Sequence, residues 1–210
     1  PAHSLGAIGV HRYDELDRTT LVVSTGPLRL RSRIIKRAFD TALAGAALLA
    51  LSPVLILTAI AIKLEDGGPV LFVQRRLGRG NQFFDMFKFR SMRHEKLDHD
   101  GARSTARDDD RVTRIGAFIR RTSIDELPQL LNVLFGEMSI VGPRPERPEF
   151  VEELTKQIPY YRQRHFVRPG LTGWAQVRYE YGSTVEDSQE KLQYDLYYVK
   201  NHTLFLDMVI

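Results

Sequence analysis

The longest apolar stretch of the chain runs from Thr41 to Ile62 and contains no charged residue. As a straight helix rising ~1.5 Å per residue, this stretch would cover about 33 Å, the thickness of the hydrocarbon core of a bilayer. A buried helix in a small soluble domain does not need to be apolar on every face over such a length. The pattern therefore predicts a segment that meets lipid, within a membrane helix at about residues 38–64.

Ser52-Pro53 interrupts the apolar stretch near its middle, where a proline removes one backbone hydrogen bond and disturbs the preceding turn. Basic residues flank both ends, with Lys36 and Arg37 before the stretch and Lys63 after it. The positive-inside bias would hold both ends on the cytoplasmic face. A re-entrant helix that enters the membrane, bends at Ser52-Pro53 and returns satisfies both observations. An ordinary kinked span is the alternative, because prolines are tolerated in transmembrane helices.

The rest of the chain predicts short helices and one hairpin. The segments "VLFVQRR" and "FFDMFKFRSM" alternate and flank Gly78-Arg79-Gly80-Asn81, which predicts a β-hairpin. "DRVTRIGAFIRR" predicts a basic amphipathic helix, either in the membrane interface or docked on the core. "RPEFVEELTKQIP" and "EDSQEKLQYDLYYVK" predict two further helices, the first of which Pro159 ends. The fold class is thus α+β, a mostly helical membrane-associated domain with a small sheet.

The domain organisation follows from the same pattern. Residues 1–32 are polar and mixed, which indicates a linker or the tail of an upstream region. Residues 33–210 form the main domain, with a cytoplasmic globular part at about 65–210.

The chain has no cysteine, which excludes disulfides, thiolate metal sites and a cysteine nucleophile. Its net charge of +4 is modest, but the basic residues cluster in patches that suit anionic lipid, nucleotide phosphates or nucleic acid.

Two adjacent carboxylates, Asp125 and Glu126, lie in the basic context "RRTSIDELPQLL". If Asp125 is the N-cap, Pro128 falls in the first helical turn, where its missing N–H costs nothing. We therefore predict a helix at about Glu126–Phe135, stopped by Gly136. An N-cap carboxylate should stay ionised and fixed, which serves capping and equally serves an oxygen nucleophile. Glu126 can hold a divalent cation or accept a proton.

Arginines on rigid turns favour the chemical interpretation over capping alone. Arg144 stands between two prolines, and Arg168 precedes Pro169-Gly170. Arginines on preset turns lose less entropy when they bind a phosphate bidentately, and with Lys88 they could neutralise a diphosphate beside the acids. A carboxylate that attacks phosphorus needs such cations, because two anions must approach each other.

Three motifs resemble those of the bacterial sugar transferases, which are monotopic phosphoglycosyl transferases: "KFRSM", "RVTRIGAFIRRTSIDELPQLLNVLFGEMSIVGPRPE" and "VRPGLTGWAQV". The likeness covers roughly residues 34–210. Such proteins are described as transferring a sugar 1-phosphate from a UDP-sugar to a polyprenyl (undecaprenyl) phosphate, with Mg²⁺. This step begins the assembly of exopolysaccharide, O-antigen or other glycoconjugates.

The resemblance implies a role for each matching residue. Asp125 would attack the β-phosphate of the UDP-sugar, expel UMP and carry the phosphosugar. Glu126, with Asp125 beside it, would bind Mg²⁺. The substrate phosphates would be bound by Lys88, Arg90, Arg144 and Arg168. The Ser52-Pro53 break matches the re-entrant helix of the family.

The resemblance also implies a location and partners. It places the protein at the cytoplasmic face of the bacterial inner membrane, with inner-membrane lipids, a UDP-sugar and polyprenyl phosphate as partners and no nucleic acid. It leaves the sugar unspecified and a homodimer open. Two other functions compete with this one: a basic, membrane-anchored binding module, and a Mg²⁺-dependent hydrolase of lipid-linked diphosphates that uses the same acids.

Overall fold

A computed structural model describes residues 9–13, 18–22, 30–93, 109–179, 182 and 184–210 of the chain. Within these residues the protein is α+β, with most of the chain in helices and the strands in two-stranded sheets. The α+β class predicted from the sequence is therefore confirmed.

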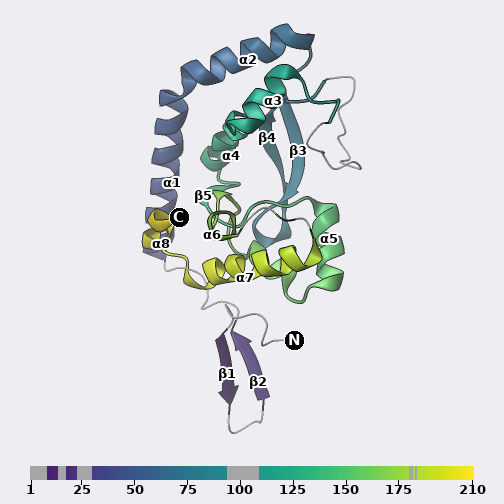
Figure 1. Ribbon diagram of the computed structural model, residues 1–210. Helices are drawn as coiled ribbons and strands as arrows, with labels where there is room; N and C mark the ends of the chain where they lie inside the picture. The colour runs from purple at the N-terminus through teal and green to yellow at the C-terminus, as the bar shows by residue number, and fades with distance from the viewer. Residues whose placement is uncertain (1–8, 14–17, 23–29, 94–108, 180–181, 183) are drawn as a thin grey trace.

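The apolar segment forms two helices with a bend between them. α1 spans Leu30–Ala50 and α2 spans Ser52–Asp66, and their axes differ by 61°. Pro53 lies in the first turn of α2, where a proline breaks no helical hydrogen bond. The predicted break at Ser52-Pro53 is confirmed, although the helical segment begins at Leu30 rather than at about residue 38. Figure 1 shows α1 along one side of the molecule and α2 across its upper end.

By length and composition, no single helix among the described residues could cross a bilayer, whereas α1 and α2 pass that test as a bent pair. Large apolar side chains project from both helices, among them Leu49, Leu57 and Leu64, which are 78%, 67% and 81% exposed. Their inner faces carry the buried Ala44 and Ile62. The described part of the chain thus leaves an apolar outer face on α1–α2.

The predicted hairpin is confirmed. Strands β3 (Leu71–Leu77) and β4 (Phe83–Phe89) pair antiparallel, with Phe72 opposite Lys88 and Gln74 opposite Met86. The turn contains the 3₁₀ segment η2 (Arg79–Asn81), in which Gly80 and Asn81 take positive φ angles of 67° and 59°. Glycine and asparagine tolerate this left-handed region better than other residues do.

The remaining elements follow in chain order as α3 (Arg114–Arg121), η4 (Ile124–Glu126), α4 (Gln129–Phe135), β5 (Ser139–Val141), α5 (Pro148–Gln157), η5 (Tyr161–Phe166), β6 (Gly170–Thr172), α6 (Trp174–Arg178), α7 (Val185–Asn201) and α8 (Leu204–Val209). The three predicted helices are present as α3, α5 and α7. Near the N-terminus, β1 (Gly9–Tyr13) pairs antiparallel with β2 (Arg18–Val22). The predicted division at residue 32 stays a prediction.

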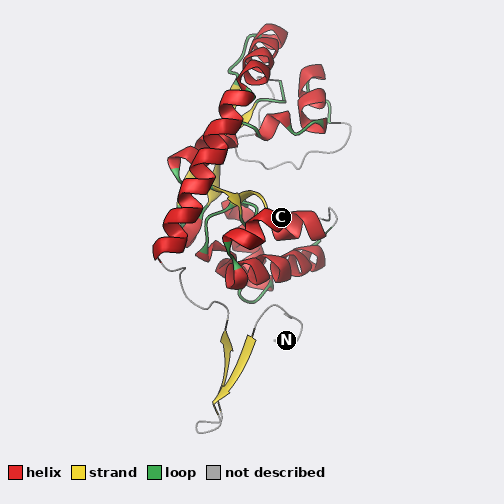
Figure 2. Cartoon of the chain, turned by 90° about the vertical axis from the view of Figure 1, so that its left-hand side faces the viewer, coloured by secondary structure: helices red, strands yellow, loops and turns green. Residues whose placement is uncertain are grey.

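Two apolar clusters place the hairpin between the helices. Met86 of β4 packs with Leu130 and Val133 of α4 and with Ala44 of α1. Leu77 of β3 packs in a second cluster that α5, η5 and α7 contribute to. Figure 2 shows α1 crossing the front of the molecule. The hairpin is thus fixed on one side by the bent helix pair and on the other by the C-terminal helices.

The β5–β6 pair brings two tight turns together. β5 and β6 are parallel, and Gly142 and Gly170 meet beside them so closely that a Cβ on Gly170 would lie 2.1 Å from the Gly142 nitrogen. Only glycine fits at such a contact. This contact holds the turn that carries Arg144 against the turn that carries Arg168.

His165 connects η5 to the hairpin turn, and we expect it to make folding pH-dependent. Its Nδ1 lies 2.7 Å from Oδ1 of Asn81, and its side chain is buried. Burial, together with Arg164 and Arg162, lowers the pKa of His165 to about 3. Between about pH 6.5 and 3 the unfolded chain therefore binds a proton that the folded chain excludes, so stability is lost as the pH falls.

Melting curves of the wild type and of His165→Gln at several pH values between 6.5 and 4.5 check this expectation. The melting temperature of the wild type should fall more steeply on acidification than that of the variant, because the glutamine has no proton to bind. Equal slopes would contradict the assignment.

Candidate active site

The carboxylate pair lies on a 3₁₀ turn rather than at a helix start. Ser123, with a φ of 56°, reverses the chain after α3, and η4 follows directly. The N–H groups of Glu126 and Leu127 donate to the carbonyls of Ser123 and Ile124, three residues back. The predicted N-cap role of Asp125 and the start of the helix at Glu126 are therefore wrong, since α4 begins at Gln129. The predicted stop at Gly136 is confirmed by its φ of 87°.

Glu126 is the anion on which two cations converge. Its Oε1 accepts hydrogen bonds from Nζ of Lys88 at 2.9 Å and from an Nη of Arg144 at 2.6 Å. Lys88 comes from β4 and Arg144 from the turn after β5, so the contact joins three distant parts of the sequence. Burial alone would raise the pKa of Glu126, but Lys88 and Arg144 outweigh it and lower that pKa to about 2. Glu126 is thus ionised throughout the physiological range.

The two cations respond to this carboxylate in different ways. Burial lowers the pKa of Lys88, and Glu126 only partly offsets that effect. Burial would lower the pKa of Arg144, but Glu126, Glu146 and Asp125 together raise it. Glu126 therefore favours the charged form of both cations.

Asp125 has a different environment from its neighbour. Burial raises the pKa of Asp125, Lys88 opposes this effect, Glu126 adds to it, and Arg120 opposes it. The raised pKa of Asp125 follows from its position as a half-buried carboxylate beside another anion. A more basic carboxylate is a better oxygen nucleophile, provided that nearby cations keep it ionised.

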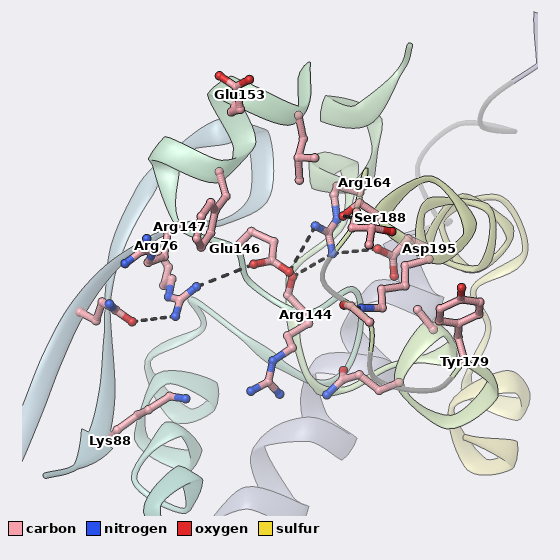
Figure 3. A pocket seen from close by; sticks show the side chains of 18 of the residues that line it. Arg76, Lys88, Arg144, Glu146, Arg147, Glu153, Arg164, Tyr179, Ser188 and Asp195 are labelled. Atoms are coloured by element: carbon pink, nitrogen blue, oxygen red, sulfur yellow. Dashed lines mark hydrogen bonds and ion pairs between the residues drawn. The ribbon is translucent and has the colours of Figure 1, made fainter. Parts of the chain in front are cut away.

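Asp125 opens onto a cleft of about 1110 Å³. Basic side chains from several elements line the cleft: Arg76, Lys88, Arg111, Arg120, Arg144, Arg147, Arg164 and Lys191. Figure 3 shows five of the cations that line it, Arg76, Lys88, Arg144, Arg147 and Arg164. Acidic side chains that also line it are Asp125, Glu146, Glu153 and Asp195. Because the cations outnumber the acids, the cleft suits an anionic ligand.

A buried cation supports the turn that carries Arg144. Arg164 donates to the Arg144 carbonyl oxygen at 3.0 Å, to the Tyr161 hydroxyl at 2.8 Å, and lies 2.8 Å from an Asp195 carboxylate oxygen. Burial alone would lower the pKa of Arg164, but Tyr161, Asp195 and Glu146 outweigh burial and raise that pKa above its usual value. The guanidinium therefore stays charged. Arg164 therefore fixes the backbone from which Arg144 reaches Glu126.

The structure does not bring every predicted phosphate ligand to this cleft. Arg90 is buried and binds both carboxylate oxygens of Asp66 at the end of α2. Arg168 lies near the charges of Arg37, Arg79 and Asp40. Lys88 and Arg144 do line the cleft with Asp125. The phosphate-binding roles of Arg90 and Arg168 stay predictions, on residues that lie apart from the carboxylate pair.

Several cleft residues were missed by the sequence reasoning, among them Arg76, Arg120, Glu146, Arg147, Arg164 and Asp195. For Arg76 a signal was present, because the register of a hairpin places cross-strand partners on one face. Phe72 is opposite Lys88, so Arg76, four residues along β3, shares the Lys88 face. For the others the signal is tertiary: their contacts join segments that are distant in sequence.

The donor set suits a magnesium ion that is shared with phosphate groups. Among the residues that the structure describes, no three or more histidine, aspartate or glutamate side chains form a cluster that could hold a metal alone. Mg²⁺ is commonly bound by one or two carboxylates together with substrate phosphates. Asp125 and Glu126 offer two adjacent carboxylates of this kind, at a cleft that suits anions.

Comparisons with known proteins give one consistent result. A family model described as bacterial sugar transferase matches residues 31–210. A UDP-N-acetylgalactosamine-undecaprenyl-phosphate N-acetylgalactosaminephosphotransferase of Aeromonas hydrophila is 48% identical over 176 residues, which cover 84% of this chain and 41% of the relative. An undecaprenyl-phosphate glucose phosphotransferase of Komagataeibacter xylinus is 48% identical over 206 residues, or 96% of this chain and 38% of the relative.

A shorter relative matches over most of its own length. The exopolysaccharide production protein PSS of Rhizobium leguminosarum bv. phaseoli is 46% identical over 185 residues, which cover 84% of this chain and 91% of that protein. In contrast, the chain spans about two-fifths of the length of the first two relatives.

Removing the partner of Arg164 should destabilise the protein. Asp195→Asn leaves a buried guanidinium without its closest anion, which costs about 3 kcal/mol or more. Glu190→Gln, at an exposed position of the same helix, is the matched control and should change stability by less than about 0.5 kcal/mol. Unfolding in urea measures both. Equal effects of the two substitutions would show that the buried ion pair is not needed.

Glu126→Gln should lower the pKa of Lys88 further, because the substitution removes the carboxylate that raises it. Labelling of lysines with acetic anhydride across a pH series measures this pKa, since only the neutral amine reacts. The midpoint for Lys88 should move to lower pH, while the labelling of Lys63 at the exposed end of α2 should be the same in both proteins. A midpoint for Lys88 that stays in place would contradict the contact.

Proposed function

This chain belongs to the bacterial sugar transferase family, and on that premise we propose that it transfers a sugar 1-phosphate from a UDP-sugar to polyprenyl (undecaprenyl) phosphate. The substrates named for its relatives support this proposal. The observation that carries the proposal is the Asp125–Glu126 pair, with Asp125 at a cation-lined cleft and Glu126 held by Lys88 and Arg144. The step would start the assembly of an exopolysaccharide, an O-antigen or a related glycoconjugate.

In the first half-reaction, a carboxylate oxygen of Asp125 attacks the β-phosphorus of the UDP-sugar. The bond from that phosphorus to the bridging oxygen breaks, and the electron pair leaves with UMP. The product is an aspartyl phosphosugar, a mixed anhydride that keeps its transfer potential. Lys88 and Arg144 offset the repulsion between the carboxylate and the phosphate.

In the second half-reaction, a phosphate oxygen of the polyprenyl phosphate attacks the same phosphorus. The bond to Asp125 breaks, the carboxylate is restored, and the sugar leaves as a polyprenyl diphosphate conjugate. Mg²⁺ bound by Glu126 and Asp125 would neutralise charge on the reacting phosphates. Two half-reactions allow a soluble donor and a lipid acceptor to use one site in turn.

The same proposal places the protein at the cytoplasmic face of the bacterial inner membrane, with α1–α2 as a re-entrant hairpin. The 61° bend, the exposed apolar side chains and the basic residues at both ends support this arrangement. Arg90 ties the end of α2, through Asp66, to the end of β4, two residues from Lys88. The depth of the helix pair in the membrane would therefore set the depth of the site.

Asp125→Asn tests the mechanism. Wild-type protein incubated with UDP-sugars and Mg²⁺, without lipid, should release about one UMP per chain and gain the mass of a phosphosugar on the peptide that contains Asp125. The variant should release UMP at least about a thousandfold more slowly, because it lacks the nucleophile. Asp85→Asn, at an exposed position of β4, is the matched control and should behave as the wild type.

Two outcomes would contradict the covalent mechanism. Release of UMP only after polyprenyl phosphate is added would favour direct displacement by the lipid. Release of free phosphosugar from a lipid-linked diphosphate, with no glycolipid formed, would favour the hydrolase.

A further inference from the structure

A second group of cations lies in the cleft beyond Lys88 and Arg144, and the proposed mechanism gives it no role. Arg76 comes from the end of β3 and Arg147 from the residue before α5, and both line the cleft. Their side chains are each 15% exposed. Figure 3 shows them together on the wall of the cleft, with Arg144 and Glu146 nearby.

Arg76 is an incompletely satisfied buried cation. It donates to Oε1 of Gln74 at 2.6 Å and to the carbonyl oxygen of Pro145 at 3.3 Å. Its Nε is buried and has no hydrogen-bond partner among the described residues. Burial lowers the pKa of Arg76 to about 10, Glu146 offsets this in part, and Arg144 and Arg147 lower it further. Like charges therefore crowd around this guanidinium.

Glu146, the acid closest to Arg76, is shared rather than dedicated. It lies 3.9 Å from Arg76 and 3.8 Å from Arg164, both longer than a hydrogen bond. Glu126, in contrast, accepts hydrogen bonds from both Lys88 and Arg144. Arg76 is therefore less closely paired with a carboxylate than Lys88 and Arg144 are.

Arg147, the second cation of this group, is held in place by contacts with neighbouring side chains of α5. Its guanidinium lies over the ring of Phe150, 4.2 Å from the centroid, and its Nε lies 3.9 Å from Glu149. Stacking on an aromatic ring restricts the orientation of the Arg147 guanidinium. Preset arginines lose little entropy when they bind a phosphate.

We propose that Arg76 and Arg147 form a second phosphate subsite, which binds the phosphate of the nucleoside monophosphate that leaves in the first half-reaction. This inference rests on the proposed function. The bond that breaks transfers negative charge to the leaving phosphate, and cations placed there stabilise that charge. Arg144 lies near both subsites, because its charge lowers the pKa of Arg76 and of Lys88.

The register of the hairpin favours the nucleotide over the lipid phosphate. Lys88 is opposite Phe72, near the end of β3 that follows α2, whereas Arg76 lies four residues further on. At ~3.3 Å per residue this places Arg76 about 13 Å further along the strand, away from α2. In Figure 1, α5 also lies on the side of the molecule opposite α1. A lipid phosphate that enters beside α2 would meet Lys88 first.

Binding of UMP and of uridine to the full chain tests the subsite. Arg76→Gln and Arg147→Gln should each weaken the binding of UMP about tenfold or more, because each removes a charged hydrogen bond to phosphate. Binding of uridine, which has no phosphate, should change little. Arg75→Gln removes the neighbouring charge on the exposed face of β3 and should bind UMP as the wild type does.

Steady-state kinetics separate the two sources of phosphate. In the two variants, the KM for the UDP-sugar should rise about tenfold, and the KM for polyprenyl phosphate should stay within about twofold. A rise only in the KM for the lipid, or wild-type affinity for UMP in both variants, would overturn the subsite while leaving the proposed function intact. Failure of the wild type itself to form UMP from any UDP-sugar would instead overturn the proposed function.

Discussion

The site depends on one carboxylate that two cations share. Glu126 accepts hydrogen bonds from Lys88 on β4 and from Arg144 on the turn after β5, and this contact joins the hairpin, the 3₁₀ turn and the Gly-Pro-Arg-Pro segment at one place. The pKa values of the two adjacent acids also shift in opposite directions. The pKa of Glu126 is lowered to about 2, so Glu126 stays ionised, while the pKa of its half-buried neighbour Asp125 is raised. Adjacent residues of the same charge therefore acquire different chemistry from their surroundings.

Two buried arginines keep this contact in position from opposite sides. Arg90 fastens the end of the bent helix pair to the end of β4, and Arg164 fastens the turn of Arg144 to α7 through Asp195. Neither needs to touch a substrate to matter. If the helix pair lies in a membrane, Arg90 connects the membrane-bound helices to the strand that carries Lys88, whereas Arg164 connects the turn of Arg144 to the C-terminal helices. In the proposed reaction, the cations of the cleft would line the route between the lipid phosphate and the nucleotide.

Local pattern was enough to predict the elements that local chemistry fixes. The hairpin follows from alternation around Gly80 and Asn81, and the break between α1 and α2 follows from Pro53. The helix start at Glu126 was predicted wrongly because Pro128 is compatible with several starts. The left-handed Ser123, which decides between them, gives no signal in the sequence.

The charged side chains also fall into two groups: those that sequence motifs identify, and those whose partners depend on tertiary packing. Lys88, Arg144 and the acid pair could be selected from the motifs that carry them, but their mutual contacts are tertiary. Asp66, the partner of Arg90, is 24 residues away in sequence and has no motif of its own. Asp195, the partner of Arg164, lies on a helix whose pattern indicates only an amphipathic surface. Pairing over such distances depends on how the helices pack, which periodicity does not specify.

The central claim is that the carboxylate of Asp125 forms a bond to phosphorus, and a UDP-sugar labelled with ³²P at its β-phosphate tests it most directly. In the absence of lipid, the label should appear on the intact protein and be removed by hydroxylamine, which cleaves acyl phosphates. Polyprenyl phosphate added to the labelled protein should then carry the label into the glycolipid. Label that passes to the glycolipid without ever being bound to the protein would contradict the account.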